Sequence, residues 1–148
     1  MIKIFFANSN TITSWIIRLF TFSKYSHVGF INEDTNTVLD SDGNTGVSEY
    51  PVGLLYKNYS KVYIFPLVIP YKSYYRALFE IGKDYDYLGV IGLPFNRNWQ
   101  EDDKWFCSEL VAYVLQGFIT IKDQHRVTPN NLLKLLQIKL EGKYDANI

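Results

Sequence analysis

Residues 105–118 read Trp-Phe-Cys-Ser-Glu-Leu-Val-Ala-Tyr-Val-Leu-Gln-Gly-Phe, and this stretch is the clearest helix in the chain. Its apolar side chains recur at helical spacing and form one stripe along a helix face. The members of the stripe are Leu110, Val111, Val114, Leu115 and Phe118. Asp103 precedes the stretch as the expected N-cap. Cys107 therefore falls in the first turn of the predicted helix.

Cys107 is the only cysteine among 148 residues, which excludes an internal disulfide and a cysteine-rich zinc site. A lone cysteine is most often a small buried hydrophobic residue, and that is one interpretation. The first helical turn favours another, because its unpaired N–H groups and the helix dipole stabilise a thiolate and lower a thiol pKa. The neighbouring Trp105 and Phe106 either form a wall for an acyl group or only anchor the helix.

A thiolate nucleophile needs an imidazole within hydrogen-bonding reach, and the chain has only two histidines. His27 begins the alternating segment His27–Asn32, which predicts a strand and hence a rigid support. It is either a catalytic base or a half-buried strand histidine bound to a neighbour. His125 lies in the polar stretch 122–126 and is interpreted as a solvated loop residue.

The predicted partner of the His27 strand is the segment Thr37–Ser41, because a polar turn at residues 33–37 joins the two. Asp40 lies near the end of that segment, where strand pairing can bring it beside His27. A carboxylate there would orient the imidazole and stabilise the imidazolium. Asp40 and Asp42 are otherwise turn-forming residues before Gly43.

The remaining patterns predict one α+β domain over residues 1–148. Further strands are expected at 1–6, 46–50 and 61–65. Helices are expected at 11–20, 71–83 and from Thr128-Pro129 to about Ile138, with Thr128 as N-cap. Residues 84–103 are expected to be irregular, and the polar part at 96–103 is expected to be a mobile loop beside the active site.

Composition narrows the classes of function. Apolar residues make up 47% of the chain, which indicates a globular fold. The formal net charge is zero, so no nucleic-acid partner is expected. No apolar run reaches the roughly 20 residues that a membrane span needs, and Asn8–Thr11 interrupt the apolar start before it forms a signal-peptide core. We expect a cytoplasmic protein, in a bacterial cell or a phage-infected host. No histidine, cysteine or carboxylate spacing indicates a metal site or a cofactor.

Two motifs together resemble a known family. They are Tyr25-Ser26-His27-Val28-Gly29-Phe30 and Trp105-Phe106-Cys107-Ser108-Glu109-Leu110-Val111. They are similar to the permuted NlpC-type papain-like cysteine hydrolases, the YiiX/YaeF-like amidase group, in which the histidine strand precedes the cysteine helix. The segment Gly82-Lys83-Asp84-Tyr85-Asp86 and the pair Thr128-Pro129 also match the family's pattern in order. The resemblance covers residues 2–136.

The resemblance implies a circularly permuted papain-like fold, with a small antiparallel sheet or barrel and packed helices. It implies that Cys107 is the nucleophile, His27 the general base and Asp40 the acid that orients the imidazole. Asp40 stands where the family more often has glutamate, so the side chain is one methylene shorter. The resemblance also implies that Tyr85 lies near the active site, where its hydroxyl or the Cys107 backbone N–H would hold the oxyanion. Trp105 is expected at the substrate because of its place beside Cys107.

The function expected from these residues is a thiol hydrolase that cleaves an amide bond, whether peptide, isopeptide or N-acyl, through an acyl-enzyme. An acyltransferase for lipid-type acyl groups uses the same triad, so it stays an alternative. A catalytically inactive binding or inhibitory module of the same fold is another, and a structural protein with a core cysteine is a third. The expected partner is a small-molecule, peptide or lipid-type amide substrate. The sequence leaves its identity and the oligomeric state open.

Overall fold

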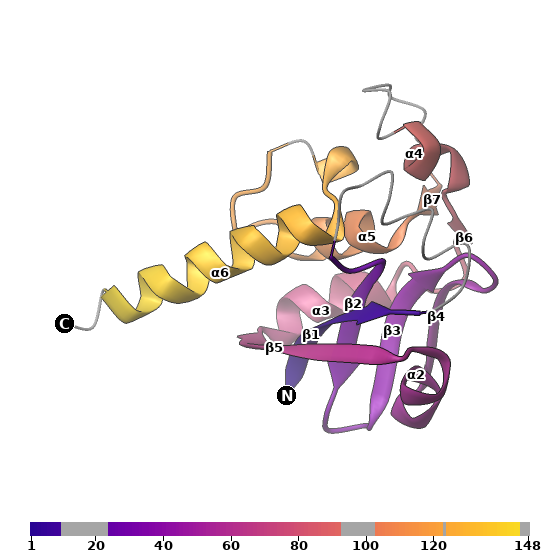
Figure 1. Ribbon diagram of the computed structural model, residues 1–148, viewed down its shortest axis with the longest axis horizontal. Coiled ribbons are helices and arrows are strands. Elements are labelled where there is room, and N and C mark those ends of the chain that lie inside the picture. Colours follow the sequence, from indigo (N-terminus) through magenta and orange to yellow (C-terminus); the bar gives the residue numbers. More distant parts are fainter. Residues whose placement is uncertain (10–23, 93–102, 123, 146–148) are drawn as a thin grey trace.

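The computed structural model describes residues 1–9, 24–92, 103–122 and 124–145 (Figure 1). Its centre is a five-stranded sheet in the order β4-β3-β2-β1-β5, in which every neighbouring pair is antiparallel. The strands are β1 (Ile2–Asn8), β2 (His27–Asn32), β3 (Thr37–Asp42), β4 (Gly46–Pro51) and β5 (Lys61–Ile69). A short parallel pair joins β6 (Asp84–Tyr85) to β7 (Lys104–Trp105). The helices are α2 (Val52–Asn58), α3 (Tyr71–Leu78), α4 (Tyr87–Gly92), α5 (Cys107–Val114), the 3-10 turn η2 (Gln124–Arg126) and α6 (Pro129–Asp145). The fold class is therefore α+β, as predicted.

The sheet buries both of its faces, so its central strands are apolar on both sides. On one face, side chains of the sheet pack against α3, α5 and α6 in the larger core. On the other face, a smaller cluster includes Leu55 of α2. Strand β1 supplies both, with Ile4 and Phe6 in the larger core and Phe5 in the smaller one. Figure 1 shows α2 at the lower end of the sheet and α6 extending from the upper layer.

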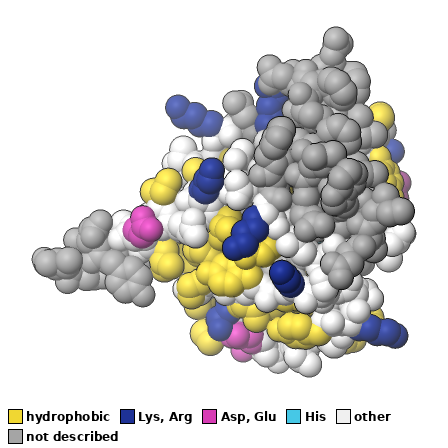
Figure 2. Space-filling model, in the orientation of Figure 1, with side chains coloured by type: hydrophobic (Ala, Val, Ile, Leu, Met, Phe, Trp, Pro, Cys, Tyr) yellow, Lys and Arg dark blue, Asp and Glu magenta, His cyan; other side chains and the backbone are white. Residues whose placement is uncertain are grey.

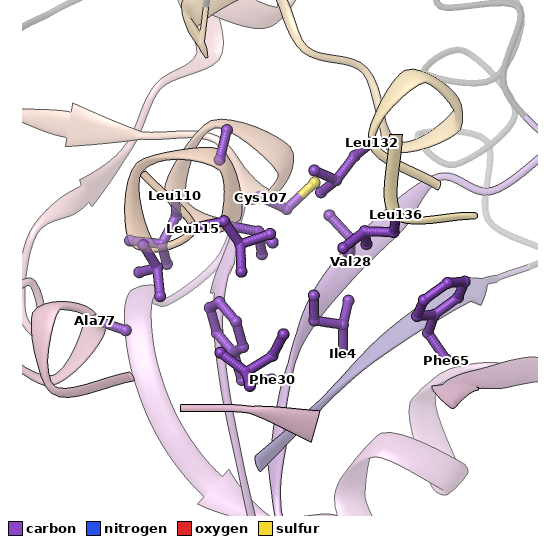
Figure 3. Close-up of a cluster of buried hydrophobic side chains, with 14 of the residues drawn as sticks. Ile4, Val28, Phe30, Phe65, Ala77, Cys107, Leu110, Leu115, Leu132 and Leu136 are labelled. Carbon is purple, nitrogen blue, oxygen red and sulfur yellow. The ribbon is translucent and has the colours of Figure 1, made fainter. Parts of the chain in front are cut away.

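Helix α5 lies against β2 in the larger core. Figure 3 shows Cys107 and Leu110 of α5 above Val28 and Phe30 of β2, with Leu132 and Leu136 of α6 beside them. All of these residues except Cys107, which is 4% exposed, are completely buried. Full burial of a leucine or phenylalanine side chain stabilises a fold by about 1.5–3 kcal/mol. This contact therefore fixes the cysteine helix on the histidine strand.

Strands β2, β3 and β4 lie where the sequence predicts them, within a residue or two. The helix predicted at residues 105–118 is shorter at both ends and spans Cys107–Val114. Lys104 and Trp105 pair with β6, and Gly117 has a positive φ of 82°, which does not continue a helix. Phe106 precedes the helix with extended backbone angles, so Asp103 is not the N-cap. Cys107 is consequently the first residue of α5.

Other segments differ in length or were not predicted. Strand β5 continues through Pro66 to Ile69, because β5 is an edge strand where proline can be accommodated. Helix α3 ends at Leu78, before the predicted end at Lys83. Helix α2 was not predicted, and β6 and α4 lie in the stretch predicted to be irregular. The helix predicted at 11–20 and residues 96–102 of the predicted loop lie outside the described residues.

Helix α6 begins where the sequence predicts it and continues beyond the predicted end. The hydroxyl of Thr128 accepts a hydrogen bond from the Asn131 N–H at 3.2 Å, so Thr128 is the N-cap. Within the described residues, no helix combines the length and the apolar character that crossing a membrane requires. Figure 2 shows the surface in the same orientation, with Lys and Arg side chains scattered among apolar ones rather than gathered in one basic patch on this face.

Candidate active site

A buried imidazole–carboxylate pair lies between β2 and β3. Nε2 of His27 and Oδ2 of Asp40 are 2.7 Å apart, and the two side chains are 7% and 0% exposed. His27 begins β2, and antiparallel pairing of Phe30 with Leu39 brings the end of β3 beside it. A charged pair this deep in the fold is stable only when both partners are held and hydrogen-bonded.

Gly29 leaves the space that Asp40 occupies. A Cβ atom at position 29 would lie 2.6 Å from the Asp40 Cβ and 2.9 Å from the Leu39 carbonyl oxygen. Real Cβ atoms do not approach other heavy atoms this closely, so any larger residue would displace Asp40 or the strand. The glycine in the Ser-His-Val-Gly motif therefore has a packing reason in this chain.

Two tyrosines that the sequence analysis did not single out complete the surroundings of this pair. The Tyr50 hydroxyl donates a hydrogen bond to the same Asp40 oxygen at 2.6 Å. The Tyr59 ring stacks on the His27 ring, with centroids 4.9 Å apart and planes 7° from parallel. Strand alternation could have found Tyr50, because it lies two positions after Ser48, the residue paired with Asp40. No motif indicated Tyr59.

Cys107 occupies the first position of α5. The N–H groups of a first helical turn have no partner within the helix, and they carry the positive end of the helix dipole. The next residue, Ser108, is fully buried and donates its hydroxyl to the Val127 carbonyl at 2.5 Å. Cys107 itself is 4% exposed and belongs to the larger core. Figure 3 shows its side chain directed toward Leu132 of α6, above Val28.

The three side chains influence one another electrostatically. Burial alone would lower the pKa of His27. The charge and hydrogen bond of Asp40 oppose that effect, a hydrogen bond with Cys107 and its charge add to the opposition, and the pKa rises from 6.5 to about 10. Because Nε2 faces Asp40, Nδ1 is the ring nitrogen left for the thiol. His27 therefore interacts with both the carboxylate and the sulfur, and its raised pKa favours the imidazolium at neutral pH.

Tyr85 and Trp105 are neighbours in the β6–β7 pair. Burial raises the pKa of Tyr85 well above its usual value, and the charge of Cys107 is the next contribution, so the phenol lies near the sulfur and stays protonated. Trp105 is fixed in another way: its indole N–H donates to Glu80 at 2.6 Å and its ring packs on Tyr113. Its carbonyl accepts the Ser41 hydroxyl at 2.6 Å, which ties β3 to the segment before α5.

The structure thus brings His27, Asp40 and Cys107 together and places Tyr85 near the sulfur. The indole N–H of Trp105 is already donated to Glu80, and a substrate role for its ring stays a prediction. His125 lies in η2. Across residues 1–9, 24–92, 103–122 and 124–145, no group of three or more His, Cys, Asp or Glu side chains is arranged to hold a metal ion.

The fold is similar to that of a solved structure. It resembles the crystal structure of the metalloprotein yiiX from Escherichia coli O157:H7, DUF1105, with a TM-score of 0.59 and 26% sequence identity. The similarity covers 78% of this chain and 63% of that one, so this chain spans less than two thirds of the length of yiiX. No protein-family model matches the chain, and no curated protein matches it. The described residues of this chain offer no ligand set that fits the metal of a metalloprotein.

Proposed function

We propose that this chain is a thiol hydrolase of a permuted papain-like fold, which cleaves an amide bond through an acyl-enzyme on Cys107. The observation that carries the proposal is the buried 2.7 Å contact between His27 and Asp40, with Cys107 near enough to contribute to the raised pKa of His27. The similarity to yiiX, the protein of the group that the two sequence motifs resemble, supports it.

The proposed reaction begins from an ion pair, in which the thiol proton of Cys107 already resides on Nδ1 of His27. The raised pKa of His27 favours this imidazolium, and Asp40 holds it at Nε2. The thiolate then attacks the carbonyl carbon of the substrate, and a C–S bond forms while the carbonyl electron pair moves to oxygen. Backbone N–H groups in the first turn of α5 would stabilise this oxyanion, and each such donor is worth about 2.7–4 kcal/mol in other enzymes.

Collapse of the tetrahedral intermediate breaks the C–N bond. The imidazolium gives its proton to the leaving amine and returns to the neutral form. Water then attacks the thioester with His27 as the base, which releases the acid and restores the thiol. With a lipid-type acyl group on Cys107 and an acceptor other than water, the same site would be an acyltransferase.

A catalytically inactive module of the same fold is the second candidate. The observation that favours it is the burial of Cys107, which at 4% exposure packs in the larger core like a structural cysteine. In that case the His27–Asp40 pair would only stabilise the sheet. The two candidates differ in whether the sulfur can be acylated.

Acylation by an activated ester tests the proposal. The protein is incubated briefly with p-nitrophenyl acetate, and intact mass and peptide mapping locate the acetyl group. Hydroxylamine cleaves thioesters and tyrosine esters alike, so fragmentation of the mapped peptide is used to place the acetyl group on Cys107, the only cysteine. We expect rapid acetylation of the wild type and none in Cys107→Ala.

His27→Ala should slow the acetylation at least about a hundredfold, the lower end of what general base catalysis contributes. His125→Ala is the matched control, since it removes the other histidine. Acetylation confined to lysines, or equal rates in wild type and His27→Ala, would support the inactive module instead.

A further inference from the structure

The His27 ring contacts two aromatic side chains. On one face lies Tyr59, nearly parallel at 4.9 Å. Phe5, which is completely buried, also packs against the His27 ring. The two ring planes are tilted by 49° and their centroids lie 5.8 Å apart. With Nε2 held by Asp40, rotation of the imidazole about its Cβ–Cγ bond would drive the ring into Tyr59. The stack therefore keeps the ring in the plane in which Nε2 reaches Asp40 and Nδ1 is left for Cys107.

Hydrogen bonds to α2, β1 and β3 fix the position of Tyr59. Its backbone N–H donates to the Leu55 carbonyl at the end of α2, at 3.0 Å. The next residue, Ser60, donates its N–H to the Asn8 carbonyl of β1 at 2.9 Å. The Tyr59 hydroxyl donates to Asp42 of β3 at 3.4 Å, a long bond at the other end of the ring. The ring is thus fixed by the sheet that carries His27 and Asp40.

The Tyr59 ring adds no charge to this environment. Burial, followed by the charges of Asp40 and Asp42, raises the pKa of Tyr59 far above its usual value, so the phenol stays neutral. A neutral ring over the pair excludes water, and a lower local dielectric strengthens the attraction between imidazolium and carboxylate. Asp40 of β3 and Cys107 of α5 act on His27 directly. The other charged or titratable groups act on its neighbours: Tyr50 of β4 on Asp40, Asp42 of β3 on Tyr59, and Tyr85 of β6 beside Cys107 and Tyr59.

We propose that Tyr59 is a positioning residue, whose ring face holds the His27 imidazole toward Cys107 and shields the His27–Asp40 hydrogen bond from water. The inference rests on the proposed function, because positioning matters for the reaction only if Cys107 is a nucleophile. It concerns the ring face and not the hydroxyl. Tyr59→Phe should therefore keep the His27 pKa and the acylation rate of the wild type, whereas an aliphatic substitution at this position should lower both.

The test follows the titration of His27 by NMR of 15N-histidine-labelled protein. The chain has two histidines, so His125→Gln assigns the signals. Tyr59→Leu admits water to the pair and should move the His27 pKa from about 10 back toward 6.5. Tyr59→Phe keeps the stack and should titrate close to the wild type. Tyr56→Leu, on α2 with its side chain 53% exposed, is the matched control and should leave the titration unchanged.

The same variants are assayed for acetylation of Cys107. Tyr59→Leu should lower the rate constant for acylation about two- to tenfold, the factor that loss of one aromatic pair predicts, with KM little changed. Tyr59→Phe should recover most of that loss. If Tyr59→Leu does not fold, Tyr59→Met replaces it, because methionine fills the space without a ring face.

Three results would overturn the inference. The first is a His27 pKa in Tyr59→Leu that equals the wild-type value. The second is an equal loss of acylation rate in Tyr59→Phe and Tyr59→Leu, and the third is a shift of the His27 pKa in Tyr56→Leu as large as that in Tyr59→Leu. The titration does not depend on turnover. If His27 shifts as expected but the wild type is never acetylated, the shielding of the His27–Asp40 pair by Tyr59 stands and the proposed function fails.

Discussion

The substitution Asp40→Asn removes the carboxylate that faces His27 while it keeps the size of the side chain. In the structure, Oδ2 of Asp40 accepts hydrogen bonds from His27 at 2.7 Å and from Tyr50 at 2.6 Å. The Asp40 side chain is completely buried. The amide oxygen of the substituted side chain can still accept both bonds, but it carries no charge. Asp40→Asn thus separates the electrostatic role of the residue from its packing.

The size of the effect follows from the causes of the His27 pKa. Burial lowers that pKa, and the charge and hydrogen bond of Asp40 are the largest opposing causes, which raise it to about 10. Without the charge, the pKa should fall to about 6.5 or below, because burial remains. Near pH 7.5 nearly all of the wild-type His27 is imidazolium, whereas only about one molecule in ten of the variant would be. The fraction with an imidazolium beside Cys107 therefore falls about tenfold.

Two measurements follow this change. NMR titration of labelled histidine gives the His27 pKa directly, and alkylation by iodoacetamide near pH 7.5 gives the reactivity of the Cys107 thiol. We expect the pKa of His27 to fall from about 10 to about 6.5 or below. Alkylation of Cys107 should become about ten times slower. Asp84→Asn, an exposed acid on β6, is the control and should change neither. A variant pKa that stays near 10 would refute the reasoning, because the carboxylate would then not be what holds the proton.

Three further changes test the arrangement around the pair. Tyr50→Phe removes a hydrogen bond to a charged acceptor and should lower the free energy of unfolding in urea by about 1.5–3 kcal/mol; an unchanged unfolding midpoint would contradict this role. Gly29→Ala places a methyl group 2.6 Å from the Asp40 Cβ and should cost about 1–3 kcal/mol as well as slow alkylation; a wild-type melting curve would show that the strand yields. The folded-state pKa of His27 lies above its unfolded value, so the pair stabilises the fold fully below pH 6.5 and loses this contribution as pH rises toward 10. The free energy of unfolding should fall across that window in the wild type and stay flatter in His27→Gln; equal slopes would argue against a charged pair.

The parts of the fold that the sequence predicted are those with strong local signals. The alternation at His27–Asn32 and the turns around it located β2, β3 and β4. The apolar stripe after Cys107 located α5, and the Thr-Pro pair located the start of α6. Local patterns also favoured Asp40 as the partner of His27, because hairpin pairing leaves few alternatives at that end of β3.

The parts that escaped prediction depend on tertiary contacts. Residues 104–105 continue the helical pattern, yet they form a strand because β6 offers a partner and Trp105 is buried. Strand β5 passes through Pro66 because it lies at the edge of the sheet. Tyr59 lies 32 positions from His27, in the connection between α2 and β5. The two rings stack only because β5 joins the sheet beside β1 and α2 packs on the face of the sheet. No local sequence pattern encodes such a contact.

The rate of Cys107 alkylation by iodoacetamide, measured against pH in the wild type and in His27→Ala, tests the central claim most directly. We expect the wild type to react faster than free cysteine near pH 6, where an unassisted thiol is almost entirely protonated. His27→Ala should lose this advantage and react no faster than free cysteine. Equal profiles for the two proteins, at or below the rate of free cysteine, would contradict the account and leave Cys107 as a structural thiol of the core.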